Sequence, residues 1–171
     1  MSVPNQRAGG CVLSVYLICV GKLKERFYID AAAEYQKRLS GYCKFTLLEL
    51  PEEKLPQNPT QGQVEQALWK EAQSITAKLP ASSHLVAMCV EGKTQSSEQL
   101  AQMMESVQQS SAKHLVFVIG GSYGLHPYIK EKAAVRLSMS PMTFPHHLAR
   151  IMLLEQIYRG FKIQEGSSYH K

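Results

Sequence analysis

Apolar residues along this chain follow two alternating patterns, short continuous runs and helical stripes. The continuous runs are typical of buried strands, and they cover Val12 to Val20, Lys44 to Leu50, His84 to Val90, Leu115 to Ile119 and Val135 to Met139. In the other segments apolar residues return every three or four positions, which predicts helices. These segments are Glu25 to Leu39, Gln63 to Leu79, Ser97 to Gln109, a short helix from Pro127, and Pro145 to about Lys162. Strands that alternate with helices predict an α/β fold with a mostly parallel sheet and helices on both faces.

Two strand ends are expected to form one pocket. The run Leu115 to Ile119 stops at Gly120 and Gly121, where main chain without side chains can approach a ligand. After the last short strand, Ser140, Pro141 and Thr143 lead to Pro145, which is placed to open a helix. In open α/β sheets ligands bind at the carboxyl ends of strands. The pocket walls suit a flat, partly apolar cofactor, and we expect them to include Met139, Met142, Phe144 and Leu125.

The last helix carries an apolar face wider than one sheet normally needs. This face comprises Ile151, Leu153, Leu154, Ile157, Tyr158 and Phe161. We expect the same helix of a second subunit to cover part of it, giving a homodimer, and the alternative is a central helix in a crowded monomer. Arg150 lies within the apolar arc, so it must be paired or face a pocket. It either contacts an anion beside the pocket or forms a salt bridge across an interface.

Composition bounds the function only loosely. With 171 residues and 44% hydrophobic residues, the chain is expected to form a single domain over residues 12–171, after a disordered extension over residues 1–11. No run reaches the roughly 18 apolar residues of a membrane span, and we expect a cytoplasmic protein. The four cysteines stand singly, which favours small core residues over zinc ligands or disulfides. A net charge of +5 fits a polyanionic partner such as RNA without identifying one.

Several kinds of chemistry lack their motifs. The two glycines do not have the spacing of a dinucleotide fold or a P-loop, and there is no HExxH, nucleophile elbow or pair of carboxylates beside the pocket. His146 and His147 fall in the first turn of the last helix, where the dipole favours neutral imidazole, useful in a base. Capping and packing are the alternative. The terminal Tyr169, His170 and Lys171 could stack on and pair with a nucleotide, or form a terminus without a role.

The segments IGGSYGL from Ile119, MTFPHHLARIMLLEQIYRGFKI from Met142, VGKLKERF from Val20 and the terminal YHK resemble the ribosomal large subunit methyltransferase H family of the SPOUT superfamily. The resemblance runs from about Val12 to Lys171. It implies a SPOUT-type α/β fold with a C-terminal trefoil knot, a homodimer, and S-adenosyl-L-methionine as methyl donor. The implied reaction is methylation at N3 of a pseudouridine in large-subunit (23S) rRNA, either as free rRNA or in assembled ribosomes.

Carried over residue by residue, the resemblance gives a set of cofactor-binding positions: Met88, Gly120, Gly121, Met139, Ser140, Pro141, Met142, Thr143 and Phe144. The family often has Leu at the position of Met88. His147 replaces the commoner Pro or Gln, so we do not expect it to be essential.

The implied reaction also suggests roles for other residues. N3 of pseudouridine is mostly protonated near neutral pH, so transfer needs a base. We expect His146 or the pair Tyr169 and His170 to take the proton, and Arg150 and Lys171 to hold RNA. The expected phosphate-contacting patch is Lys22, Lys24 and Arg26. No metal is required. The alternatives are a non-catalytic RNA-binding module with a vestigial pocket, and a metabolic enzyme that uses another nucleotide cofactor.

Overall fold

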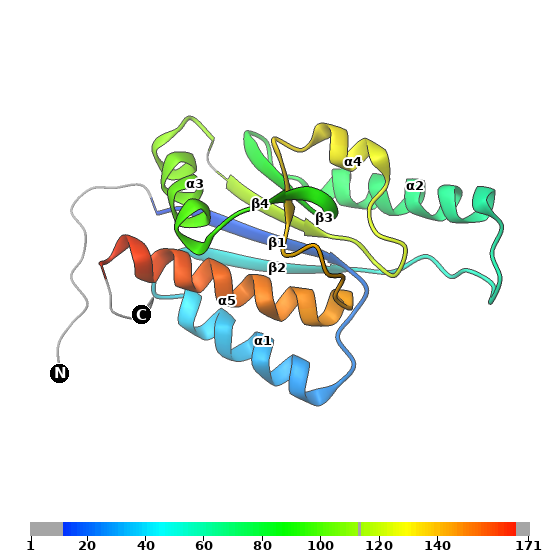
Figure 1. Cartoon of the computed structure of the whole chain (residues 1–171), viewed down its shortest axis with the longest axis horizontal. Helices are drawn as coiled ribbons and strands as arrows, with labels where there is room; N and C mark the ends of the chain where they lie inside the picture. Colours follow the sequence, from blue (N-terminus) through cyan, green and yellow to red (C-terminus); the bar gives the residue numbers. More distant parts are fainter. Residues whose placement is uncertain (1–11, 113, 167–171) are drawn as a thin grey trace.

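A five-stranded parallel sheet forms the centre of the computed structural model, which describes residues 12–112 and 114–166 (Figure 1). The strands are β1 (Ser14–Val20), β2 (Lys44–Leu50), β3 (Ser83–Thr94), β4 (His114–Ile119) and β5 (Val135–Ser138), in the order β2-β1-β4-β3-β5. All pairings between them are parallel. The predicted α/β class and its parallel sheet are therefore confirmed.

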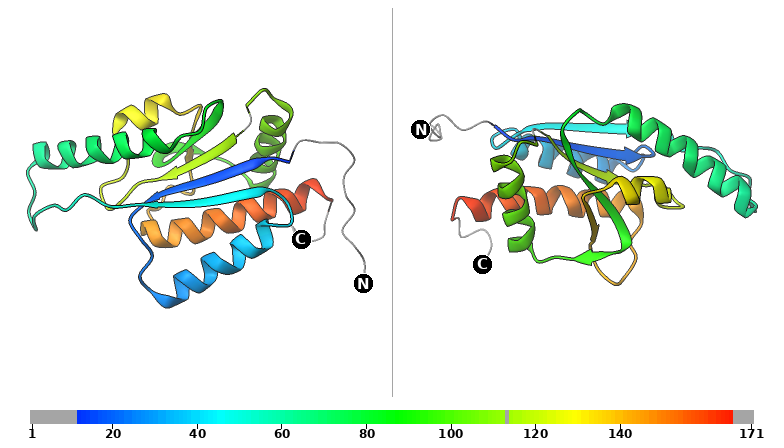
Figure 2. Two further views of the ribbon diagram at one scale, coloured as in Figure 1. Left: turned by 180° about the vertical axis from the view of Figure 1, so that it is seen from behind. Right: turned by 90° about the horizontal axis from the view of Figure 1, so that it is seen from above.

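Helices cover both faces of the sheet, as predicted (Figure 2). One face carries α1 (Arg26–Leu39), α3 (Ser97–Gln109) and α5 (His146–Gln164), and the other carries α2 (Gln61–Lys78) and α4 (Pro127–Lys132). The starts of α2 and α3 are fixed by capping boxes, in which Thr60 pairs with Gln63 and Ser96 with Gln99. Each box satisfies backbone donors that the first helical turn leaves open.

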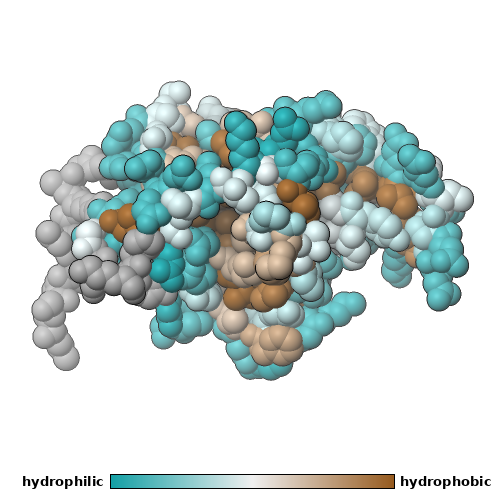
Figure 3. All heavy atoms as spheres, in the orientation of Figure 1, coloured by the Kyte–Doolittle hydropathy of each residue, from teal (hydrophilic) through white to brown (hydrophobic). Residues whose placement is uncertain are grey.

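The broad apolar face of α5 is used within the chain. The helix lies between α1 and α3, and its Leu153, Leu154 and Ile157 are buried in the core beneath these helices. The crowded-monomer alternative therefore explains much of the width of this face. Ile151 and Tyr158 remain half-buried, and apolar atoms gather over α5 at the centre of the face seen in Figure 3. The dimer stays a prediction.

Strand β3 continues beyond the predicted end at Val90 and wraps over β5. It pairs with β5 at Val86–Met88 and again at Lys93 and Thr94, with an irregularity between the two stretches. A Cβ atom on Gly92 would lie 2.7 Å from the carbonyl carbons of both Arg136 and Leu137. The backbone at Gly92 therefore crosses β5 in direct contact. The trefoil knot itself stays a prediction.

Two of the cysteines occupy the core positions predicted for them. Cys19 and Cys43 are buried, whereas Cys89 is half-buried and Cys11 lies outside the described residues. Within the described parts of the chain, no helix is long and apolar enough to cross a membrane.

Candidate functional site

A cavity of about 350 Å³, here called the main cavity, opens at the carboxyl ends of β3, β4 and β5. Its walls come from the ends of these strands, the loop after β4 and the segment that leads into α5. Most of the predicted cofactor residues line it: Met88, Gly120, Gly121, Met139, Ser140, Met142, Thr143 and Phe144. The structure thus brings together the two strand ends that the sequence suggested, and Met88 of β3 lies beside them as the resemblance implied.

Pro141 is the exception, because it does not line the main cavity, and its contact with a cofactor stays a prediction. This residue is exposed and borders a separate hollow beside Val90 and Gly92. The turn around it explains the outward position. The backbone N–H of Met142 donates to Ser140 Oγ at 3.0 Å, and Ser138 Oγ donates to the carbonyl oxygen of Ser140 at 2.9 Å. These bonds close a tight turn with Pro141 at its outer side.

The packing of the chain itself requires a glycine at Gly120, whereas Gly121 lies against the end of a flexible side chain. A Cβ on Gly120 would lie 2.2 Å from the carbonyl oxygen of Gly124, and one on Gly121 would lie 2.6 Å from Glu52 Oε1. The backbone N–H of Ser122 donates to the same Glu52 oxygen at 2.8 Å. Open backbone for a ligand was the expected reason for these glycines. The structure also shows a tight loop held against the carboxylate that follows β2, and both glycines line the main cavity.

The main cavity also contains an ion pair that the sequence did not reveal. Lys130 of α4 donates to the carboxylate of Glu91, and this hydrogen bond holds the pKa of Glu91 below its usual value. Both residues line the cavity, together with Cys89. A carboxylate there can accept hydrogen bonds from hydroxyl or ammonium groups. Glu91 and Lys130 lie 39 positions apart, so no local motif connects them.

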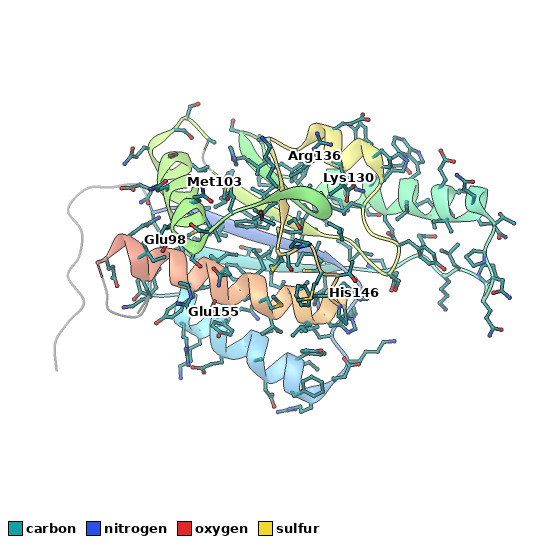
Figure 4. The ribbon with its side chains drawn as sticks, viewed as in Figure 1. Glu98, Met103, Lys130, Arg136, His146 and Glu155 are labelled. Carbon is teal, nitrogen blue, oxygen red and sulfur yellow. The ribbon has the colours of Figure 1, made fainter. Side chains whose placement is uncertain are left out.

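His146 connects the main cavity to a second hollow of about 680 Å³, here called the lysine hollow. It lies at the start of α5, beside the open end of the sheet (Figure 4). Lys22, Lys24 and Glu52 line the lysine hollow, and Tyr123 lines both spaces. A residue in this position can contact ligands in both.

Burial keeps the imidazole of His146 neutral. It lowers the pKa of His146, and the nearby charge of His147 lowers it further. The sequence had suggested the helix dipole as the cause. The two rings are 4.2 Å apart between centroids, and His147 Nδ1 lies 3.5 Å from the carboxylate of Glu25. His146 is thus the histidine of this pair that faces the cavity as a neutral group.

The carboxylate of Glu52 responds to the same surroundings. Burial would raise its pKa, but the hydrogen bonds from Ser122 and the charges of His146 and His147 lower it overall. Glu52 therefore stays ionised and keeps the loop after β4 fixed to the segment after β2.

Arg150 does not face the lysine hollow, and its expected contact with RNA is wrong. Its side chain has no exposed surface and pairs with the carboxylate of Glu49 on β2. Its Nη2 donates to the carbonyl oxygen of Gly21 at 2.9 Å. The partner is a carboxylate, but the bridge lies within the chain and not across an interface as the alternative expected.

The expected basic patch is only partly assembled at the site. Lys22 and Lys24 are exposed and line the lysine hollow. Arg26 points along α1, where its guanidinium pairs with Asp30 at 2.9 Å and does not line the hollow. The other expected RNA contacts, Tyr169, His170 and Lys171, lie outside the described residues. Among the residues described, no group of three or more His, Cys, Asp or Glu side chains could hold a metal ion.

Comparison with known proteins agrees with the geometry of the site. A family model described as "Predicted SPOUT methyltransferase" matches residues 13–170. The chain is also 43% identical over 159 residues to a protein of Streptococcus uberis named "Ribosomal RNA large subunit methyltransferase H". That match covers 93% of this chain and 100% of the relative. Both matches include the loops that enclose the main cavity.

Proposed function

This chain belongs to the family of SPOUT methyltransferases, and from that premise we propose that it transfers a methyl group from S-adenosyl-L-methionine to N3 of a pseudouridine in large-subunit (23S) rRNA. The observation that carries the proposal is the position of His146. Its side chain borders both the main cavity, which suits the donor, and the lysine hollow, where Lys22 and Lys24 can contact RNA phosphates. A methyl donor and a nucleobase in these two spaces would meet beside one neutral imidazole.

The residues of the main cavity fit the methyl donor. Met88, Leu125 and Met139 offer apolar surface to an adenine ring. Glu91 supplies a carboxylate for hydroxyl or ammonium groups, and the backbone after β4 supplies further polar atoms. When bound, S-adenosyl-L-methionine supplies an electrophilic methyl group on a positively charged sulfur. The protein itself then has to orient the acceptor and take one proton.

Proton removal is assigned first to His146, which borders the lysine hollow. N3 of pseudouridine is an imide nitrogen that has to lose its proton when it is methylated. We propose that His146, neutral because it is buried, accepts this proton; the pair Tyr169 and His170 is the alternative. Lys22 and Lys24, with Lys171, hold RNA phosphates. Arg150 contributes indirectly, because it fixes the backbone at Gly21.

The proposal includes a homodimer and a cytoplasmic location beside ribosomes. Large apolar side chains are exposed on α1 and in the segment before α5, among them Phe27 at 65%, Ile29 at 41% and Met142 at 69%. A partner subunit over α1 and α5 would cover such residues. The proposal also includes the C-terminal trefoil knot, which is supported by the close crossing of Gly92 over β5.

Labelled methyl donor tests the proposal directly. We would incubate the protein with methyl-labelled S-adenosyl-L-methionine and either assembled ribosomes, free 23S rRNA, or ribosomes whose rRNA lacks pseudouridine, and then map the label. We expect one labelled nucleotide, methylated at N3, and no label without pseudouridine. Saturable donor binding in calorimetry without transfer to any rRNA would contradict the proposed reaction. Absence of donor binding would favour a non-catalytic RNA-binding module, and affinity for another nucleotide would favour a metabolic enzyme.

A further inference from the structure

A cluster of aromatic side chains lies on the face of the sheet opposite α5. Trp69 of α2 is 42% exposed and Tyr128 of α4 is 38% exposed. The indole ring lies 5.2 Å from the ring of His126 and 5.5 Å from that of Tyr128, measured between centroids. These three residues line a hollow of about 660 Å³, here called the aromatic hollow. Large planar surfaces are thus held together at a concave, accessible place.

The aromatic hollow lies next to the lysine hollow of the proposed active site. Leu68 lines both the aromatic hollow and the lysine hollow. Tyr123 and His146 in turn line both the lysine hollow and the main cavity. The three hollows are therefore neighbours on the surface, and RNA held in the lysine hollow would lie close to the aromatic rings.

The charges around the aromatic rings favour a nucleobase over a phosphate. Glu65 and Glu131 border the aromatic hollow, and carboxylates repel phosphate oxygens. The ammonium group of Lys132 lies 5.6 Å from the ring centroid of Tyr128, where it adds a positive charge against the aromatic face. Unpaired bases of RNA loops stack on such aromatic faces, and every base has a face that can stack.

We propose that Trp69, His126 and Tyr128 form a stacking platform for an unpaired nucleobase of the RNA, close to the nucleotide that is methylated. This inference rests on the proposed function, because it places RNA in the lysine hollow. The platform gives the enzyme a contact with RNA outside the active site. It accounts for two large aromatic side chains that are left substantially exposed beside the site.

The chain contains a single tryptophan, so Trp69 itself reports on stacking. We would titrate the protein with single-stranded oligoadenylate and follow the fluorescence of Trp69. We expect saturable quenching by the single strand and little quenching by double-stranded RNA of equal charge. The variant Tyr128→Ala should bind the oligonucleotide about tenfold more weakly, as expected for the loss of one stacking surface.

Enzyme kinetics provide the second measurement. Trp69→Ala should raise KM for ribosomes about tenfold, with kcat and the affinity for S-adenosyl-L-methionine unchanged. Trp69→Phe keeps a smaller aromatic face and should restore most of the affinity. Gln73→Ala truncates another exposed residue of α2 that does not line the aromatic hollow, and it should leave KM unchanged. Thermal unfolding of each variant shows whether α2 and α4 stay folded.

Two outcomes overturn the platform. If Trp69→Ala lowers Tm but leaves KM unchanged, the aromatic cluster only stabilises the packing of α4 against α2. If KM rises but oligoadenylate does not quench Trp69, this surface binds a ribosomal protein. If the wild-type protein transfers no methyl group at all, the proposed function fails, and the quenching titration still decides on stacking separately.

Discussion

Arg150 of α5 donates a 2.9 Å hydrogen bond to the carbonyl oxygen of Gly21, which lies 129 positions earlier in the chain. Glu49 completes the arrangement, because its carboxylate pairs with Arg150 and also accepts a 3.1 Å hydrogen bond from the backbone N–H of Leu23. The buried guanidinium therefore fixes the loop that carries Lys22 and Lys24. Arg150 acts on RNA binding through the position of this loop.

Replacing Arg150 by Met should lower the free energy of unfolding by about 3 kcal/mol, because the carboxylate of Glu49 and the carbonyl of Gly21 both lose their donor. The matched control is Arg26→Met, which breaks an exposed ion pair with Asp30 and should cost less than about 1 kcal/mol. Urea denaturation of both variants measures the difference. Equal losses of unfolding free energy in the two variants would show that the buried ion pair stabilises the fold no more than the exposed one.

Gly92 should tolerate no side chain. Its Cβ would lie 2.7 Å from two carbonyl carbons of β5, and backbone cannot move aside as a flexible side chain can. We expect Gly92→Ala to lower Tm markedly and to slow refolding. The control is Gly62→Ala in α2, where a Cβ would meet nothing within 4 Å. This variant should raise the free energy of unfolding by about 0.4–1 kcal/mol. A Gly92→Ala protein with the wild-type Tm would mean that the crossing over β5 is loose.

The sequence was sufficient for the elements and for the edge of the sheet that carries the site, because both follow from local apolar patterns. The segment Ser97–Gln109 is a helix and Lys44–Leu50 a strand as predicted. The sequence was not sufficient to predict contacts between distant segments. Glu91 with Lys130 and Glu49 with Arg150 are pairs that only the tertiary fold brings together.

The reasons for individual residues were also hidden in the sequence. The sequence predicts ligand approach at Gly121, but it does not show that a Cβ there would also meet the carboxylate of Glu52, about 70 positions earlier in the chain. Arg150 was correctly recognised as a buried charge in need of a partner. Whether that partner is RNA or a carboxylate depends on which strand lies opposite α5, and no helical pattern contains that information.

If His146 is the base, activity should fall only at acidic pH. Burial lowers its pKa below the usual 6.5, so kcat should be constant down to about pH 6.5 and should decrease as the pH falls through the lowered pKa. The free energy of unfolding should change with pH in the same direction as kcat. The unfolded chain binds the proton more readily than the folded chain, so the free energy of unfolding decreases as pH falls below 6.5.

Two variants make this pH profile specific. His146→Gln should lower kcat by about 10²- to 10⁴-fold, as expected for loss of a general base. His147→Gln removes a charge that lowers the pKa of His146, so the acidic limb should move to higher pH with kcat preserved. Full activity of His146→Gln would transfer the role of base to Tyr169 and His170.

Cys89 should report on occupation of the main cavity. It lines the cavity and is half-buried, and burial raises the pKa of its thiol. We expect slow alkylation by N-ethylmaleimide at neutral pH, faster alkylation at higher pH, and protection by saturating S-adenosyl-L-methionine.

Mass spectrometry of the peptides gives the rate at each cysteine. Burial raises the pKa of Cys19 and Cys43 to about 12, so both should stay unmodified in the folded protein and serve as internal controls. Equal rates at Cys89 with and without the donor would place the donor elsewhere.

Of the three residues Lys22, Lys24 and Arg26, the two lysines should contribute most to the salt dependence of RNA affinity. Each phosphate contact with a single strand adds about 0.7 to the slope of log K against log salt concentration. The variant with Lys22→Ala and Lys24→Ala should therefore flatten the slope by about 1.4 for every sequence tested. Arg26→Ala should change it little, since Arg26 is paired with Asp30 and lies outside the lysine hollow. Filter binding across a salt series separates the two variants. A larger effect of Arg26→Ala would move the RNA path away from the lysine hollow and onto the exposed side of α1.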